Sequence, residues 1–203
     1  MGTLEIVDAA LFGRLNEVED IEFWHQLEKS IGNKFYSLTT GQLIQLNFAL
    51  KGTVRKGSPR MHSILKDLLE EDLPKMSHQQ LTAFFYSLRN GKIDVAALQD
   101  KILNHLEPLY EKMNFEQKVN WLFTYTISRR PQAFKQAHTK SLHENLRKAN
   151  QVLFSMNFSS EISKELTSVE QCLNLVFSLA LLKTKNTKFI TDEILIYLRE
   201  HIE

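Results

Sequence analysis

Amide side chains recur along this chain at spacings that suit recognition chemistry. Four glutamines open segments that align without gaps, and in three of these segments a second amide follows three residues later. Residues i and i+3 share one face of a helix, so each of the three presents an amide pair. A side-chain amide carries two donors and an acceptor, which suit base edges or peptide groups. The amides are Gln42 and Gln45, Gln80, Gln117 and Asn120, and Gln171 and Asn174.

The same glutamines also fit a purely structural role. A glutamine three residues after a helix N-cap can accept a hydrogen bond from the backbone N–H of the cap residue. Thr39 or Thr40, Ser77 and Asn114 stand where such caps are expected. The sequence alone leaves both interpretations open: an amide stripe that contacts RNA or another partner, or a set of helix caps.

Cations supply a second candidate binding surface. They follow each of the four segments, and no acid lies between the cations of any one turn. Stacked hairpins would align them into a positive ridge suited to a phosphate backbone or to an acidic protein surface. Cations at helix C-termini also complement the helix dipole without any partner. The set is Lys51, Arg55, Lys56, Arg89, Lys92, Arg129, Arg130, Lys183 and Lys185.

Signals for catalysis or metal binding are weak. Cys172 takes the place of Leu43 and Leu81 in the alignment, so we expect it to pack as a small hydrophobic side chain. His138 and His143 are five residues apart, not the four that places two metal ligands on one helix face. The sequence has neither a glycine-rich phosphate loop nor a GxSxG motif. We therefore expect no enzyme activity, no metal and no cofactor.

The elements that position these residues follow from the spacing. The glutamines are 38, 37 and 54 residues apart, and a period near 38 is typical of stacked helical hairpins. Apolar residues at steps of four then mark the second helix of each hairpin, and a similar set lies upstream. The marked residues are Leu65, Leu69 and Leu73, Ile102, Leu106 and Tyr110, Ile194, Leu198 and Ile202, and upstream Trp24, Leu27, Ile31, Phe35 and Leu38.

The predicted fold is all-α, an α-solenoid of about four stacked helical hairpins with a terminal half-unit and one inserted helix. Residues 1–37 are expected to form an N-terminal cap and half-repeat. Repeats fill 38–203, and the third is lengthened by a helix near Gln151–Phe158 or Ser160–Leu166. The repeats are 38–75, 76–112, 113–165 and 166–203.

Helix ends and core residues are also predicted. First helices are expected to stop near Gly52, Gly91 and the Arg130–Pro131 step, and Pro59 and Pro131 suit the first turn of the helix that follows. Aromatic residues recur at fixed places in the repeat, so we expect them in the core. They are Phe84, Phe85, Tyr86, Trp121, Phe123 and Phe177.

Composition narrows the class of protein. Hydrophobic residues make up 43% and charged residues 24%, with a net charge of +1, as in an ordinary globular domain. The single cysteine fits a reducing compartment. The longest apolar run, Leu173–Leu182, is well short of the roughly 20 residues of a membrane helix, so no transmembrane segment is expected. Residues 1–28 carry seven acids and one arginine, unlike a transit peptide.

Two stretches of the sequence resemble a known family. The segments LTTGQLIQLNFALKG and MSHQQLTAFFYSLRNG are similar to the helical repeats of the octotricopeptide and FAST-kinase-like families. The resemblance covers residues 38–203, with the half-unit from about Asp20 added. It implies an organellar, often mitochondrial, helical-repeat protein that contacts RNA. The tryptophan common in that pattern is replaced here by Phe48, Tyr86, Phe123 and Phe177. We expect no nuclease-like domain of the kind that many members carry.

Two functions are consistent with these features. The first is a non-catalytic repeat module that contacts RNA or has a structural role in a mitochondrial ribonucleoprotein, such as a ribosome or an RNA-processing complex. There the amides would face bases and the turn cations would face phosphates. The second is a structural accessory subunit of a mitochondrial protein complex, such as the respiratory chain or ATP synthase, in which the repeats contact other subunits. An exposed apolar patch would favour the second.

Overall fold

The computed structural model is all-α over the residues it describes, which are 2–50, 59–88, 95–135, 147, 151–153, 162–182 and 188–201. This confirms that the fold is all-α, the broader part of the prediction. The chain divides into two compact units, Met1–His105 and Leu106–Glu203. None of the described helices is both long and apolar enough to cross a lipid bilayer.

The helices alternate with short 3₁₀ turns. Unit 1 contains α1 (Thr3–Leu15), α2 (Ile21–Gly32), η1 (Phe35–Ser37), α3 (Thr40–Leu50), α4 (Pro59–Asp72), η2 (Leu73–Lys75), α5 (His78–Ser87) and α6 (Val95–Leu106), whose last residue lies at the boundary. Unit 2 contains η3 (Glu107–Lys112), α7 (Phe115–Lys135), α9 (Ile162–Glu165), α10 (Val169–Leu182) and α11 (Lys188–His201). Pro59 begins α4, as predicted, while Gly52 and Gly91 lie outside the described residues.

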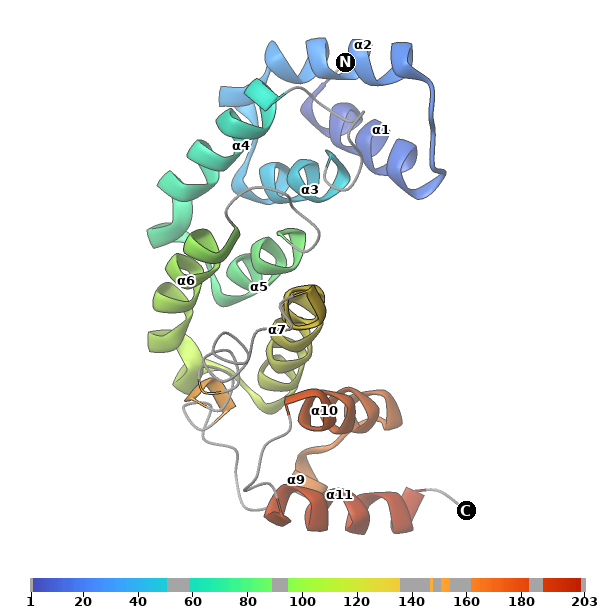
Figure 1. Ribbon diagram of the computed structural model, residues 1–203, viewed down its shortest axis with the longest axis vertical. Helices are drawn as coiled ribbons and strands as arrows, with labels where there is room; N and C mark the ends of the chain where they lie inside the picture. Colours follow the sequence, from blue (N-terminus) through green and yellow to red (C-terminus); the bar gives the residue numbers. More distant parts are fainter. Residues whose placement is uncertain are drawn as a thin grey trace. The chain divides into compact units, whose positions relative to one another are not determined.

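Unit 1 places its first helices side by side (Figure 1). α3 packs against α1 on one side and against α5 on the other, and α1 and α3 each pack against the helix that follows them. Between α3 and α5, Asn47 Nδ2 donates to Ser87 Oγ at 2.6 Å, and both side chains are buried. Thr40 Oγ1 at the start of α3 donates to Asp72 Oδ2 at the end of α4, also at 2.6 Å.

Unit 2 is built around the contact between α7 and α10. α10 also packs against α11, and α11 packs against the short helix α9. Glu193 of α11 accepts hydrogen bonds from Ser163 N at 3.1 Å and Ser163 Oγ at 2.5 Å, which lower the pKa of this carboxyl group. α9 falls within Ser160–Leu166, one of the two ranges predicted for the inserted helix.

The predicted second-helix residues form the core. Both the repeated set and the upstream set are buried at nearly every described position, because steps of four keep them on one side of each helix. Leu38 and Leu198 are half-buried, and Ile202 lies outside the described residues. The buried members are Trp24, Leu27, Ile31, Phe35, Leu65, Leu69, Leu73, Ile102, Leu106, Tyr110 and Ile194.

Two predictions are wrong. α7 does not end at the Arg130–Pro131 step but continues to Lys135. Arg129 and Arg130 therefore lie within a helix and not in a turn, and Pro131 does not begin the next helix. Proline in a helix costs roughly 3 kcal/mol locally, yet most helix stability in proteins comes from tertiary packing, here with α10.

Among the aromatics, Phe84, Phe85 and Trp121 are buried and Tyr86 and Phe123 half-buried, but Phe177 is 39% exposed.

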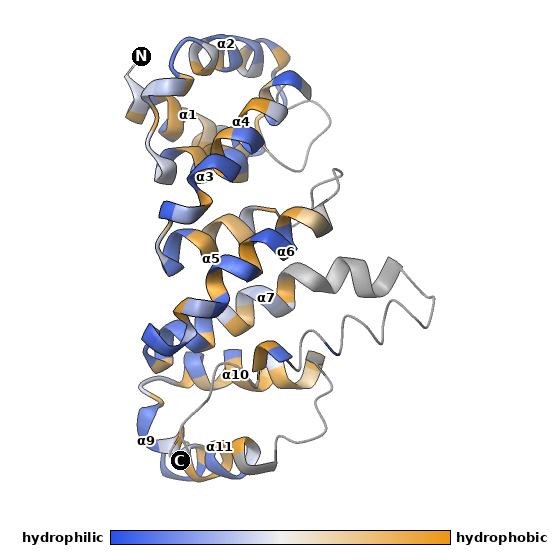
Figure 2. Ribbon diagram, turned by 90° about the vertical axis from the view of Figure 1, so that its left-hand side faces the viewer, coloured by the Kyte–Doolittle hydropathy of each residue, from blue (hydrophilic) through white to orange (hydrophobic). Residues whose placement is uncertain are grey.

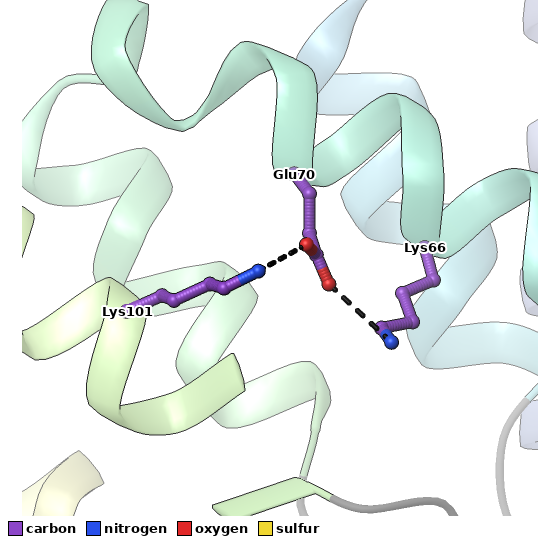
Figure 3. A network of polar contacts seen from close by, with 3 residues as sticks. All are labelled: Lys66, Glu70 and Lys101. Atoms are coloured by element: carbon purple, nitrogen blue, oxygen red, sulfur yellow. Dashed lines mark hydrogen bonds and ion pairs between the residues drawn. The ribbon is translucent and has the colours of Figure 1, made fainter. Parts of the chain in front are cut away.

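A charged cluster joins α4 to α6 (Figure 3). Glu70 Oε2 lies 2.6 Å from Lys101 Nζ, and Glu70 Oε1 lies 3.4 Å from Lys66 Nζ. The hydrogen bond from Lys101 is the main cause of a lowered pKa for the Glu70 carboxyl, against an ordinary value of 4.5. The carboxylate therefore forms an ion pair between α4 and α6, with the Lys101 side chain 56% exposed.

The pH dependence of this cluster can be tested with Lys101→Met. A lowered folded pKa gives stability that is present above the unfolded pKa and is lost as pH falls through the folded pKa. We expect the Glu70 pKa to rise toward 4.5 in the variant. The free energy of unfolding of the variant should then fall less in acid than that of the wild type. Carbon NMR titration of Glu70 and denaturation on both sides of that pH measure this. Lys75→Met, which removes a distant 4.0 Å contact to Asp72, is the control. An unchanged Glu70 pKa in Lys101→Met would contradict the assignment.

Gly13 lets α1 approach α2 closely. A Cβ atom at this position would lie 2.6 Å from Phe23 Cε1 and 2.9 Å from Trp24 Cζ2 and Cη2. The Trp24 ring is held in place because its Nε1 donates to Val18 O at 2.7 Å. The contact therefore excludes any side chain at residue 13.

We expect Gly13→Ala to lower the free energy of unfolding by about 1–3 kcal/mol, since the added methyl overpacks a fixed ring. Gly41→Ala in α3 is the matched control, because no atom lies within 4 Å of its Cβ position. It should leave stability unchanged or raise it by up to about 1 kcal/mol. Urea denaturation measures both, and equal effects of the two variants would refute the close contact.

Candidate interaction surface

Each recurring glutamine lies at the N-terminus of a first helix and caps it. Gln42 Oε1 accepts from Thr39 N at 2.9 Å, and Gln42 N donates to Thr39 Oγ1 at 3.3 Å. Ser77 and Gln80 repeat this pair at 2.9 and 3.3 Å. The predicted caps at Thr39 and Ser77 are thus present, and both glutamines have a structural role.

The first helices of unit 2 begin in a similar way. Gln117 Oε1 accepts from Asn114 N at 3.1 Å, while Gln117 N donates to Asn114 Oδ1 at 2.9 Å. Gln171 Oε1 accepts from Thr167 N at 3.1 Å, and Gln171 N donates to Ser168 Oγ at 3.2 Å. All four glutamine carbonyl oxygens therefore accept from backbone N–H groups at helix starts.

The sequence reasoning missed a fifth member of this series. Glu5 of α1 accepts from Gly2 N at 2.8 Å, the same contact that the glutamines make. Glutamate and glutamine serve equally at this position, so the predicted N-terminal cap contains a first helix that aligns with the others. A search for either residue type at the repeat period would have found it.

Because each first helix begins at the same kind of cap, residues at the same distance from the glutamine lie on the same side of each helix. Counting three residues from each glutamine reaches Gln45, Ala83 and Asn120, which are exposed, and Asn174, which is half-buried. Counting six reaches the aromatics Phe48, Tyr86, Phe123 and Phe177. At 100° per residue both positions share one side of a helix. We call these eight residues the first-helix surface.

Aromatic rings make contact along the first-helix surface within each unit. In unit 1 the Phe48 and Tyr86 rings stack with centroids 5.8 Å apart, and in unit 2 Phe123 and Phe177 lie 5.9 Å apart. Arg14 of α1 extends the first stack: its guanidinium lies 4.2 Å from the Phe48 ring centroid, and its Nη1 donates to Phe48 O at 2.8 Å. The rings thus contact each other and are not free platforms for bases.

The glutamines and the turn cations belong to opposite ends of the first helices. Gln42 lies in the first turn of α3, and the cations begin after Leu50, about 12 Å further along at 1.5 Å per residue. Seven predicted cations lie outside the described residues: Lys51, Arg55, Lys56, Arg89, Lys92, Lys183 and Lys185.

Apolar residues are exposed along one side of α10. Val169, Leu173 and Val176 are 42%, 59% and 39% exposed, and Ala180 is exposed too. Their spacing of four, three and four places them on a single side of the helix. We call these four residues the α10 stripe. Figure 2 shows how apolar the helix is as a whole.

Cys172 packs in the core, and the described residues form no cluster of metal ligands. Cys172 precedes Leu173 of the α10 stripe and is fully buried, as predicted for a small hydrophobic side chain. Burial raises the pKa of its thiol. In the part of the chain that the structure describes, no three or more His, Cys, Asp or Glu side chains gather at a point suited to a metal ion.

Comparisons with protein-family models, with curated proteins and with solved structures give no match for this chain. The resemblance to octotricopeptide and FAST-kinase-like repeats therefore stays a prediction.

The capping role of the repeated polar pair is testable at α5. Ser77→Ala should lower the free energy of unfolding by about 1 kcal/mol, since a helix start loses its side-chain acceptor. Gln80→Ala removes the reciprocal hydrogen bond, and the double variant should show a non-additive coupling in denaturation experiments. Gln45 is exposed and does not lie at a capping position, so Gln45→Ala should change the free energy of unfolding by less than about 0.5 kcal/mol. Additive effects of the Ser77 and Gln80 changes would rule out the reciprocal pair.

Proposed function

We propose that this chain is a non-catalytic helical-repeat module, an α-solenoid of four hairpins, that binds protein subunits of a larger assembly. The single observation that carries the proposal is the α10 stripe. Exposed aliphatic residues aligned on one helix side favour contact with another protein, because water solvates such a patch poorly. The amides and cations of the sequence are secondary to it.

The packing in unit 1 supports the repeat part of the proposal. α3 contacts α1 and α5 on opposite sides, as a first helix does in stacked hairpins. The buried Asn47–Ser87 hydrogen bond fixes the register between two such helices. Stacks of this kind offer long surfaces to partners and rarely assemble catalytic groups.

RNA contact is the second candidate function. It is favoured by the first-helix surface, where the described residues in unit 1 carry Gln45 beside stacked aromatics and the Arg14 guanidinium. Repeat proteins that read single-stranded RNA recognise one base per helical repeat through a few side chains. Against it stand the capping role of the four glutamines and the aromatic contacts within the surface. A mitochondrial location for either function is inferred from the family resemblance.

The test is a native pull-down of tagged protein from its own cells, with and without nuclease, read by mass spectrometry and RNA sequencing. We expect a set of protein partners that nuclease does not remove and that Leu173→Glu depletes. Tyr36→Glu, at a 90% exposed residue in η1, is the matched control. RNA together with partners that vanish on nuclease treatment would instead establish the second candidate. That result should then be matched by RNA binding that weakens with salt.

A further inference from the structure

We propose that α1 provides a second docking surface, and that its partner is a basic amphipathic helix of another protein. The surface consists of Leu4, Asp8, Phe12 and Leu15, which lie on one side of α1, and we call it the α1 face. The inference goes beyond the proposed function, because it uses no residue of the α10 stripe and states the chemistry of the partner. Apolar side chains of the α1 face provide the contact area, and its acids select the partner.

Three large apolar side chains of the α1 face are exposed. Leu4, Phe12 and Leu15 are 65%, 59% and 75% exposed. Steps of four, four and three residues from Leu4 to Leu15 keep all four members on one side of the helix. A surface helix normally turns polar residues toward water, since the hydration of apolar groups is unfavourable. The α1 face therefore has the composition of a contact surface.

The opposite side of α1 is fixed in the core. Ile6 and Ala10 are fully buried in a helix that packs against both α2 and α3 (Figure 1). The turn after α1 is held as well, because Val18 N donates to Gly13 O at 2.9 Å and Val18 O accepts from Trp24 Nε1 at 2.7 Å. The α1 face is therefore preformed, and a partner that docks on it orders little of this chain.

Negative charge on and beside the α1 face is not compensated. Asp8 is exposed on the face itself, and Glu17 is exposed in the turn that follows. Neither carboxylate forms a hydrogen bond or an ion pair in the part of the chain that the structure describes. Residues 1–28 contain seven acids and a single Lys or Arg, which is Arg14. Its guanidinium contacts the Phe48 ring and carbonyl oxygen.

Local helix stability does not explain these two acids. Carboxylates stabilise helix N-termini, and Asp20 meets this need for α2 because its Oδ1 accepts from Glu22 N at 2.9 Å. Glu17 instead follows the C-terminus of α1, where the helix dipole disfavours an acid. Its φ of 51° is also a conformation that Gly, Asn or Asp adopts with less strain. Asp8 lies inside α1, where aspartate has a low helix propensity.

Charge selects the occupant of the α1 face. Docking removes Asp8 from water, and a buried carboxylate without a cation is strongly unfavourable. A helix with one apolar side edged by Lys or Arg meets both requirements. Its apolar residues pack along α1, while its long basic side chains reach Asp8 and Glu17. The same acids repel RNA phosphates and anionic lipid headgroups, so a basic amphipathic helix fits this face better than either.

The test uses a fluorescein-labelled peptide of about 18 residues, roughly five helical turns, with leucine on one side and lysine on the other. Fluorescence anisotropy with the full chain measures its dissociation constant. We expect saturable binding that weakens as salt is added, because the charge contacts lie at the edge of the apolar area. Two control peptides should bind at least about tenfold more weakly. One carries glutamate in place of lysine, and the other has the same composition in an order that breaks the helical spacing.

Two variants of the chain test the two parts of the α1 face. Asp8→Lys should weaken binding of the lysine peptide at least about tenfold and should bind the glutamate peptide more tightly than the wild type does. Phe12→Ser should weaken binding of the lysine peptide by a similar factor, because apolar contact area is lost. The matched controls lie outside the α1 face and should change the dissociation constant by less than about twofold. They are Asp192→Lys, at an exposed acid of α11, and Tyr36→Ser, at an exposed aromatic residue of η1.

The outcomes separate the proposed partner from other occupants. Asp8 and Phe12 are exposed, so circular dichroism melting of both variants should match the wild type and exclude loss of the fold. Wild type that does not bind the lysine peptide at several hundred micromolar overturns the inference, and so does equal binding by Asp8→Lys. Self-association that Phe12→Ser abolishes in sedimentation velocity would assign the face to a second copy. Binding to phosphatidylcholine vesicles that Phe12→Ser abolishes would assign it to a membrane. Either result overturns the inference as well.

Discussion

The reciprocal hydrogen bonds at the start of each first helix are the constraint on which the described structure depends. A cap fixes which residue begins the helix, and with it the direction of every later side chain, since one residue more or less turns the pattern by 100°. Gln42 and Gln80 do this with the same pair of contacts at nearly the same distances. Consequently Asn47 and Ser87 meet across α3 and α5, and Phe48 stacks on Tyr86. Register between helices is set by a local, polar interaction at their ends.

The helices and their buried sides could be predicted from the sequence because apolar residues repeat with the period of a helix and polar residues mark the helix starts. Steps of four placed Leu65, Leu69 and Leu73 in the core, and the cap at Ser77 was visible from residue type and position. The role of the glutamines was harder to assign. An amide at the third helical position has the same spacing whether it caps a backbone or reads a ligand, so periodicity cannot distinguish the two. Only the distances to backbone N–H groups favour capping.

Other features were beyond sequence reasoning because they depend on tertiary contacts. The end of α7 was placed at Pro131 from a local penalty, which packing outweighs. The close contact at Gly13 can be predicted only if the position of the Trp24 ring is known, and the spacing of residues in the sequence does not give that position. Exposure of Phe177 and Leu173 was also hidden, because each matches residues that are covered in other segments. A repeated pattern predicts the same burial everywhere, whereas burial depends on which neighbour covers each helix side.

The chemistry of the covered and uncovered helix sides differs in a way that bears on function. Between α3 and α5 the contact includes a buried Asn47–Ser87 hydrogen bond, which allows one register and penalises others. The α10 stripe has the reverse character: it is aliphatic although exposed. A helix side that stays in water is expected to be polar, since nothing there compensates for apolar hydration. An aliphatic side gains free energy only when another surface removes it from water, at roughly 25 cal/mol per Å² of apolar area. Its composition is therefore that of a contact side.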